Sequence, residues 1–438
     1  MSSSIEGDFG HAERLERVYK KVIWRLVPFI FICYIFAYFS RINVSFAKLE
    51  MLADIQLSET AYGFGAGIFF IGYVIFAVPS NIFLAKIGAK RWICILMIAW
   101  GIFSTCLMFT RTPMQFYVLR LLTGIAEAGF FPGVVYYFTR WFPSERRGQV
   151  ISLFMAAIPL SGVLGGPLSG FIMDTFGNHQ LNLAGWEWLF LLYGIPTILL
   201  GFSVFWFMPD SYNSCTFLTP EEKQIIAIDL QKEEQRKDSD CKNNSVLGFL
   251  FSPMVWYFCL IYFFIEMGEY AIGFWMPSII KSSGFDSLSL IGVLSSIPYL
   301  FAGIVMIYVG RSADLHKERR WHLIIPMLVG MVGLLIAAKF AHSPVIAMIG
   351  LTLSTIGVLT SLPMFWTVPS AMLGSAAAAG GLALINSIGN LAGFCSPYLV
   401  GWIKDTTNNT DIALYILAGS VFIGALLILR IPKKLLAH

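Results

Sequence analysis

Apolar stretches long enough to cross the roughly 30 Å hydrocarbon core of a bilayer recur along the whole 438-residue chain, separated by short polar segments. Hydrophobic residues make up 57% of the chain and charged residues only 13%, a balance outside the range of soluble domains. We therefore predict an all-α integral membrane protein. The twelve predicted transmembrane helices cover residues 23–45, 60–84, 91–110, 114–138, 149–173, 186–208, 254–279, 287–309, 322–341, 343–366, 376–403 and 411–431.

Lysine and arginine gather on one side of these predicted helices. That side holds the N-terminal segment 1–22, the turns 86–91, 140–147 and 311–320, the loop 209–250 and the end from residue 430. The other side holds only Lys48, Arg111, Lys281, Lys339 and Lys404. Cytoplasmic loops carry the excess of Lys and Arg, so we expect both termini in the cytoplasm and the chain in the inner (cell) membrane. The first helix lacks a small-residue cleavage site and is expected to remain uncleaved.

The longest polar interruption divides the chain into two predicted six-helix bundles, residues 23–208 and 254–431, joined by a cytoplasmic linker at 209–253. A cytoplasmic tail follows at 432–438. Within the linker, the segment 218–235 (LTPEEKQIIAIDLQKEEQ) predicts a helix capped by Thr219 with a narrow apolar side. The dense charges at 232–240 are typical of a solvated linker; a regulatory contact is the alternative.

The two predicted bundles resemble each other between their second and third helices. The first turn reads NIFLAKIGAKR (81–91) and the second GRSADLHKERR (310–320), each with a basic cluster at the same offset. Any short cytoplasmic loop collects Lys and Arg, but the shared offset and position favour an internal parallel repeat. The predicted gating or structural residues of the two turns are Gly88, Lys90, Arg91, Gly310, Asp314 and Arg319.

These two turns resemble the hallmark loop of the major facilitator superfamily, and the resemblance extends over essentially the entire chain. The glycine-rich segment GVLGGPLSG (162–170) is similar to the fifth-helix motif of that superfamily, where small residues let helices touch closely. Three further segments resemble the anion:cation symporter family: FSRINVSFA (39–47), GIAEAGFFPG (124–133) and NSIGNLAGFCSPYLVGWIKD (386–405). Members of that family mostly import organic anions, such as phthalate, tartrate, sugar acids or 4-hydroxyphenylacetate, with protons.

Two charged residues, Arg120 and Glu127, lie inside the apolar stretch 116–138. Charges at that depth are costly and usually line a path for substrate or protons. Seven residues apart, the two share one helix face within about 20° and lie about 10 Å apart along the axis. Arg41 is expected at the depth of Arg120, so we predict that Arg41 and Arg120 hold the substrate carboxylate. The alternatives are an ion pair of Arg120 with Glu127 that only joins helices, and an Arg41 that extends to the lipid headgroups.

Glu127 is the predicted proton-coupling residue. Desolvation favours the protonated form of a carboxyl and a nearby cation favours the ionised form, so protonation can answer to substrate occupancy. The resemblance assigns the matching glutamate of bacterial sugar-acid symporters the same role. Ser40 departs from the family pattern, because many bacterial relatives carry an aspartate there. We predict that Glu266 or Glu269 replaces it as a titrating group; binding substrate hydroxyls or pairing with Arg41 is the competing reading.

Four other residues are candidates for contacts with the substrate. Asn386 and Asn390 stand at i and i+4 and can hydrogen-bond hydroxyl groups, or can join helices instead. Tyr34 and Trp275 are aromatic candidates for stacking on the substrate, although aromatic residues fill 15% of the chain and most must pack or face lipid.

Several function classes are excluded by the sequence. It has no phosphate-binding loop of the GxxxxGK[ST] type and no sizeable soluble domain, so an ATP-driven pump or an enzyme is not expected. The cysteines and histidines lack metal-ligand spacing, and we predict no metal and no cofactor other than the proton gradient. The predicted protein is a monomer that binds a small organic anion and protons, with no nucleic acid partner. A uniporter or anion exchanger is the alternative, and a transporter-like sensor a remote one.

Overall fold

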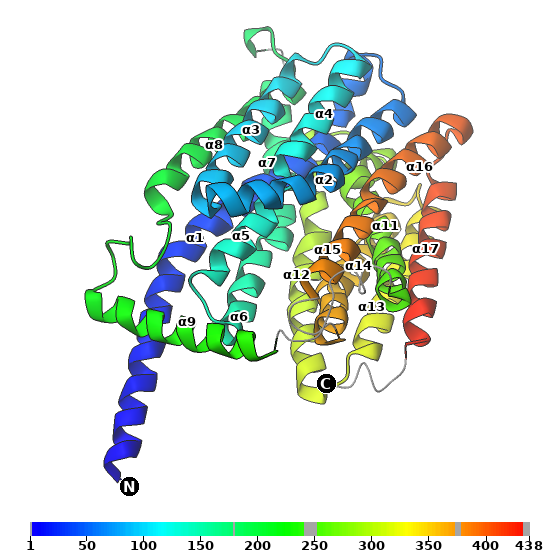
Figure 1. Cartoon of the computed structure of the whole chain (residues 1–438). Coiled ribbons are helices and arrows are strands. Elements are labelled where there is room, and N and C mark those ends of the chain that lie inside the picture. Colours follow the sequence, from blue (N-terminus) through cyan, green and yellow to red (C-terminus); the bar gives the residue numbers. More distant parts are fainter. Residues whose placement is uncertain (1, 178–179, 241–251, 373–377, 432–438) are drawn as a thin grey trace.

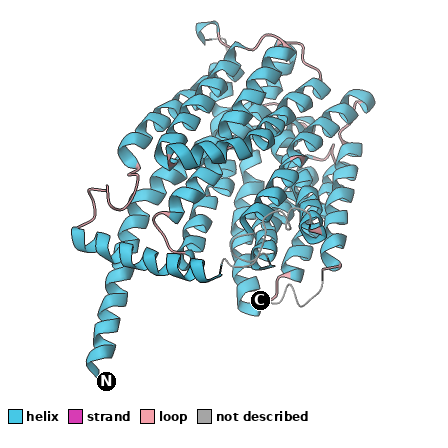
Figure 2. Cartoon of the chain, viewed as in Figure 1, coloured by secondary structure: helices cyan, strands magenta, loops and turns pink. Residues whose placement is uncertain are grey.

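The computed structural model describes all residues except 1, 178–179, 241–251, 373–377 and 432–438 (Figure 1). The described chain is helical and contains no strand, as Figure 2 shows. Eleven of its helical segments are long and apolar enough to cross a membrane. Large apolar side chains such as Ile75, Val78 and Leu199 are 60% exposed or more, a cost in water that contact with lipid removes. The predicted all-α membrane fold class is confirmed.

The N-terminal half contains eight α-helices, four of which form two end-to-end pairs (α4 with α5, and α6 with α7) that each make one membrane crossing. They are α1 (Ser2–Asp54), α2 (Glu59–Ile87), α3 (Ala89–Cys106), α4 (Pro113–Glu127), α5 (Phe130–Thr139), α6 (Ser144–Met155), α7 (Ala157–Phe176) and α8 (Gly185–Phe207). The predicted fourth span is α4 and α5 with a break at Ala128 and Gly129. A Cβ on Gly129 would lie 1.7 Å from the Ser80 hydroxyl, so only glycine permits this approach to α2.

The C-terminal half contains α11 (Pro253–Ser282), α12 (Leu288–His316), α13 (Arg320–Lys339), α14 (Pro344–Met372), α15 (Ala378–Asn390), α16 (Ala392–Thr407) and α17 (Asp411–Leu429). The predicted span 376–403 therefore consists of two helices that meet at Leu391. Neither is long enough to count among the eleven spanning helices. The eleventh predicted span is therefore broken in its middle, whereas each of the other eleven matches one of the spanning helices.

The linker helix is α9 (Pro220–Asp240), which crosses the lower part of α1 (Figure 1). The predicted cap is confirmed: the Glu222 amide donates to the Thr219 hydroxyl, and the Thr219 amide donates to the Glu222 carboxylate at 2.8 Å. Lys21 forms an ion pair with Glu222, and the Tyr19 hydroxyl donates to Asp229. These contacts attach the first part of α9 to α1. The side chains at 232–240 and the tail 432–438 lie outside the described residues.

The two matching turns end their helices in the same way. Gly88 has a φ of 89° and its amide donates to the Leu84 carbonyl, while Lys317 has a φ of 48° and its amide donates to the Ala313 carbonyl. Both residues stand seven positions after the start of their motif, which supports the predicted repeat. A positive φ favours glycine, which the first turn has at Gly88; the second turn has Lys317 at the equivalent position.

The predicted gating or structural residues of the two turns lie at or near the surface. Lys90 lies 5.9 Å from the centre of the Phe205 ring, and Arg91 is exposed. Arg319 reaches Asp314 at 3.5 Å, a pair on the surface, and Gly310 is half-buried. Their predicted role in gating stays a prediction.

The halves meet mainly along three helix pairs, α7 with α12, α2 with α16, and α1 with α11, and α2 also contacts α15. On α7, a Cβ on Gly166 would lie 2.5 Å from the Gly292 carbonyl oxygen, and one on Gly170 would lie 2.3 Å from that of Leu288. The small residues of the 162–170 motif therefore permit backbone contact between the halves, as expected. Figure 1 shows the start of α1 and the end of α17 on the same side. The boundaries of the two bundles and their orientation in the membrane stay predictions.

Candidate functional site

An ion pair inside the helix bundle joins Arg41 of α1 to Glu127 of α4. The Arg41 Nε donates to the Glu127 Oε1 at 2.5 Å. Glu127 is 1% exposed, and its other carboxylate oxygen has no hydrogen-bond partner. Within the described part of the chain Glu127 makes its ion pair with Arg41, not with Arg120, although Arg120 is close enough to act on its charge. The alternative in which Arg120 and Glu127 form the ion pair is not what the packing produces.

Arg120 is completely buried between α4 and α2. Its Nη2 donates to the Ala66 carbonyl at 3.2 Å, and its guanidinium lies 4.8 Å from the centre of the Phe69 ring. The Nε and Nη1 atoms have no hydrogen-bond partner in the structure. Buried donors of this kind are rare because each costs free energy, so they are the donors most open to an anionic ligand.

The close approach of α4 to α2 explains how this arginine becomes buried. A Cβ on Gly124 would lie 1.9 Å from the Phe69 carbonyl oxygen. Glycine therefore brings the two helix backbones together one turn after Arg120, at the start of the 124–133 motif. Gly124 therefore helps to keep Arg120 buried between α4 and α2.

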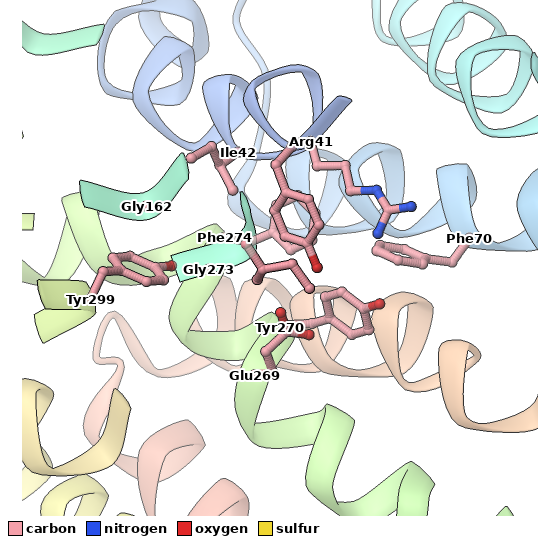
Figure 3. A pocket seen from close by; sticks show the side chains of 11 residues that line it. Arg41, Ile42, Phe70, Gly162, Glu269, Tyr270, Gly273, Phe274 and Tyr299 are labelled. Atoms are coloured by element: carbon pink, nitrogen blue, oxygen red, sulfur yellow. The ribbon is translucent and has the colours of Figure 1, made fainter. Parts of the chain in front are cut away.

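Arg41 borders a pocket between the two halves, shown in Figure 3. The cavity in this structure is small, about 30 Å³. Its walls come from α1, α2 and α7 of the first half and from α11 and α12 of the second. The lining residues are Tyr38, Arg41, Ile42, Phe70, Ile158, Gly162, Glu269, Tyr270, Gly273, Phe274 and Tyr299. Arg120 and Glu127 lie outside this lining.

Aromatic rings surround the Arg41 guanidinium. Its Cζ lies 5.2 Å from the centre of the Tyr38 ring, 5.6 Å from that of Phe69 and 5.4 Å from that of Tyr73. Such contacts stabilise a cation that has few water neighbours. Arg41 is thus held in the protein interior and does not extend to the lipid headgroups, which corrects that alternative.

Glu266 and Glu269 lie on α11, facing the region of Arg41. Glu266 is 3% exposed, and Glu269 lines the pocket. The two carboxyl groups neighbour each other, and the charge of Arg41 acts on both. Ser40, which stands at the position of the missing aspartate, is buried and donates its hydroxyl to the Phe36 carbonyl at 3.1 Å. The acidic groups near Arg41 are therefore supplied by α4 and α11.

Asn386 and Asn390 lie on α15, and the side chain of Asn390 is hydrogen-bonded within the protein. The Asn390 amide nitrogen donates to the Asn386 carbonyl at 2.8 Å, and the Tyr270 hydroxyl donates to the Asn390 Oδ1 at 2.8 Å. Tyr270 lines the pocket. This arrangement positions the Tyr270 ring, and direct contact of either asparagine with a substrate stays a prediction.

The two predicted aromatic residues lie away from the pocket lining. Tyr34 packs inside the first half, with its ring 4.2 Å from that of Phe154. Trp275 is 1% exposed and lies beneath Lys48, whose Nζ is 3.3 Å from the centre of the indole ring. Both serve packing in this structure.

Sequence reasoning missed the aromatic lining residues Tyr38, Phe70, Phe274 and Tyr299. Only Tyr38 had a usable signal, because it directly precedes the 39–47 motif. Asn43, inside that motif, was also missed: it is completely buried and neither amide atom is hydrogen-bonded. Within the described residues, no group of three or more His, Cys, Asp or Glu has the geometry of a metal site.

A helical membrane protein whose two halves enclose a charged pocket belongs to the class of membrane transporters. The model of the Major Facilitator Superfamily matches residues 30–397, and the chain therefore belongs to that superfamily. The family and the relatives found are transporters, so the chain is not an enzyme.

Two curated relatives extend the comparison over nearly the full chain. "Putative metabolite transport protein NicT" of Pseudomonas putida is 43% identical over 434 residues, which cover 99% of this chain and 98% of the relative. A "Putative tartrate transporter" of Agrobacterium vitis is 42% identical over 418 residues, covering 95% of this chain and 92% of the relative. The predicted resemblance to the major facilitator superfamily and its anion:cation symporter-like members is confirmed.

A solved structure shows the same fold. The xylose transporter XylE from E. coli, in a partially occluded inward open conformation, superposes with a TM-score of 0.76 at 16% identity. The match covers 94% of this chain and 98% of XylE.

Proposed function

We propose that this multi-pass transporter imports a small organic anion with a carboxylate group, together with protons, by alternating access across the bacterial inner membrane. The observation that carries the proposal is the Arg41–Glu127 ion pair beside a pocket that both halves line. Arg41 is the cation that a substrate carboxylate would bind, and it is paired with the Glu127 carboxylate. A proton taken up by Glu127 would neutralise that carboxylate. A relative named as a tartrate transporter supports the same substrate class.

The arrangement links the proton to the substrate in a simple way. When Glu127 is ionised, it occupies the Arg41 Nε. When Glu127 takes up a proton, its attraction for the guanidinium weakens and Arg41 is free to bind a substrate carboxylate through charge-assisted hydrogen bonds. Arg120, with two unpaired N–H groups nearby, adds a second positive charge to the same region.

Glu266 and Glu269 supply a second protonatable pair on the opposite side of the pocket. Two neighbouring carboxyl groups that share a buried site rarely ionise together, so one proton is expected to stay on the pair. The pair thus supplies a titratable group in place of the aspartate that many relatives carry at the position of Ser40. The competing reading is that one of these carboxyls binds a substrate group or balances Arg41.

Uptake into proteoliposomes tests the proposed function. With an inward proton gradient, we expect at least one of labelled tartrate, gluconate and benzoate to accumulate, and a protonophore to abolish the accumulation. Equilibration that ignores the protonophore would instead identify a uniporter, and exchange that requires acid on both sides would identify an antiporter. No uptake of any carboxylate would overturn the proposal. The energy source is the proton gradient alone, and the expected functional unit is the monomer.

A further inference from the structure

We infer that the pocket selects a planar aromatic monocarboxylate, an inference that rests on the proposed function and narrows its substrate class. Five of its lining residues are aromatic, and they approach it from both halves: Tyr38, Phe70, Tyr270, Phe274 and Tyr299. Figure 3 shows Phe70 beside the Arg41 guanidinium and Tyr270 beside Glu269, with Tyr299 on the other side of Gly273. An aromatic ligand gains stacking and edge contacts with such rings beyond its buried area.

The rings are held in place by specific contacts. The Phe70 ring centre lies 4.3 Å from that of Tyr270, and the Tyr270 hydroxyl is fixed by Asn390. A Cβ on Gly162 would lie 2.3 Å from the Tyr299 ring, so this ring lies directly against the backbone of α7. The walls are therefore flat and rigid, a shape that suits a flat ligand.

The polar groups of the lining argue against a sugar acid. The lining contains no Ser, Thr, Asn or Gln, and its only hydroxyls are those of Tyr38, Tyr270 and Tyr299. Gluconate carries hydroxyls along its whole chain, and each one buried without a partner costs free energy. An aromatic acid carries its polar groups at its edge.

The charges of the lining argue against a dicarboxylate. Among the lining residues Arg41 is the one cation and Glu269 the one acid. Arg120 adds positive charge to the region but lies outside the lining, so it offers no direct contact to a second carboxylate in the pocket. A ligand with a single carboxylate at Arg41 keeps the site balanced. The second carboxylate of tartrate would face the Glu269 side, where like charges repel.

Ligand titrations of the purified protein test this inference. We expect benzoate to bind about tenfold tighter than cyclohexanecarboxylate, its non-aromatic match, and tighter still than tartrate or gluconate. The variant Phe70→Leu should remove most of the preference for benzoate over cyclohexanecarboxylate. The control Phe64→Leu, on the same helix but outside the lining, should keep it.

The outcomes separate this inference from the proposed function. Tighter binding of tartrate or gluconate than of benzoate would overturn the aromatic selectivity and leave carboxylate transport standing. No binding of any of the four acids would count against both. A Phe70→Leu protein that melts with the wild type but keeps the full preference would also overturn the inference, since the ring would then contribute nothing.

A separate observation supports a second inference, at the end of the bundle opposite α9. There Glu59, the first residue of α2, forms ion pairs with Lys48 of α1 at 2.7 Å and with Lys404 of α16 at 2.5 Å. Lys48 is 3% exposed although it carries a charge. One carboxylate thus joins a lysine of the first half to a lysine of the second.

Backbone contacts reinforce the same junction. Asp405 accepts hydrogen bonds from the amides of Glu59 at 3.1 Å and Thr60 at 2.7 Å, so the second half caps the start of α2. A Cβ on Gly401 would lie 2.3 Å from the Glu59 carbonyl oxygen. The Tyr62 hydroxyl donates to the Phe274 carbonyl of α11.

We propose that Glu59, Lys404 and Asp405 form a latch that closes the outer side of the transporter and opens in each cycle. The three side chains join helices that alternating access must separate. The latch gives a role to Lys404 and Asp405, at the end of the 386–405 motif. In the described chain neither residue forms an ion pair or hydrogen bond with the side chain of a residue that lines the pocket.

Labelling from outside the cell tests the latch without any substrate. In a chain with its seven cysteines replaced, Gly273→Cys places a thiol in the pocket. We expect Glu59→Gln with Lys404→Gln to raise its reaction rate with a membrane-impermeant maleimide severalfold. Lys404→Arg should keep the slow rate, and so should the control pair Lys21→Gln with Glu222→Gln. An unchanged rate in the first variant would overturn the proposal.

Hydrogen exchange on the chain with its native cysteines gives a second measurement. Asp405→Asn is expected to speed exchange at the start of α2 and also at the outer end of α11 around residues 274–280. Faster exchange confined to the start of α2 would show that Asp405 is only a helix cap, and would overturn its part in the latch.

Discussion

Replacing Glu127 by Gln is expected to abolish proton-driven accumulation of substrate while exchange of substrate across the membrane persists. Glutamine keeps the shape of the side chain but takes up no proton at working pH, so Arg41 stays available and the coupling step is lost. Accumulation of labelled acid under an imposed proton gradient, and counterflow without one, measure the two activities in the same proteoliposomes.

The matched control for this variant is Glu266→Gln, which removes a carboxyl of similar burial on the other side of the pocket. We expect it to lower the charge moved per substrate without abolishing accumulation. Full accumulation by Glu127→Gln would refute its role in coupling. An unchanged charge per substrate in Glu266→Gln would assign Glu266 to substrate binding or to balancing Arg41.

Replacing Arg41 by Lys is expected to weaken substrate binding by about ten- to a hundredfold, because a hydrogen bond to a charged group contributes about 1.5–3 kcal/mol. Lysine keeps the charge but loses the planar fork that binds a carboxylate with two parallel hydrogen bonds. It also loses the stacked contacts of the guanidinium with Tyr38 and Tyr73. The apparent affinity in an uptake or titration series measures the effect.

Arg111→Lys is a suitable control, because Arg111 is 57% exposed and pairs with Glu187 away from the pocket. Lysine keeps the positive charge beside the buried Glu187, so affinity and expression should both stay near the wild type. An Arg41→Lys protein that is expressed normally and binds its substrate with wild-type affinity would remove Arg41 from the binding site.

The charged residues of the sequence located the site better than its aromatic residues did. Arg41, Glu127, Glu266 and Glu269 were chosen because a charge at bilayer depth is costly, and the structure brings all four to one region. Trp275 and Tyr34 were chosen as aromatic candidates for stacking on the substrate, and they pack outside the pocket lining. Charge is rare enough in these helices to be informative, whereas aromatic residues are too common.

The sequence by itself determined the properties that depend on neighbouring residues along the chain. The lengths of the apolar stretches set the spans, and the box at Thr219 and Glu222 set the start of α9. The shared offset of the two turns predicted helix ends that match at Gly88 and Lys317.

Only the tertiary structure decided which charges meet. Glu127 pairs with Arg41, 86 positions away, and not with Arg120 on its own helix, and Glu59 pairs with Lys404 across the two halves. Residues seven apart on one helix are about 10 Å apart along its axis, too far for a direct ion pair. The partner must therefore come from another helix, and helix packing alone selects which one.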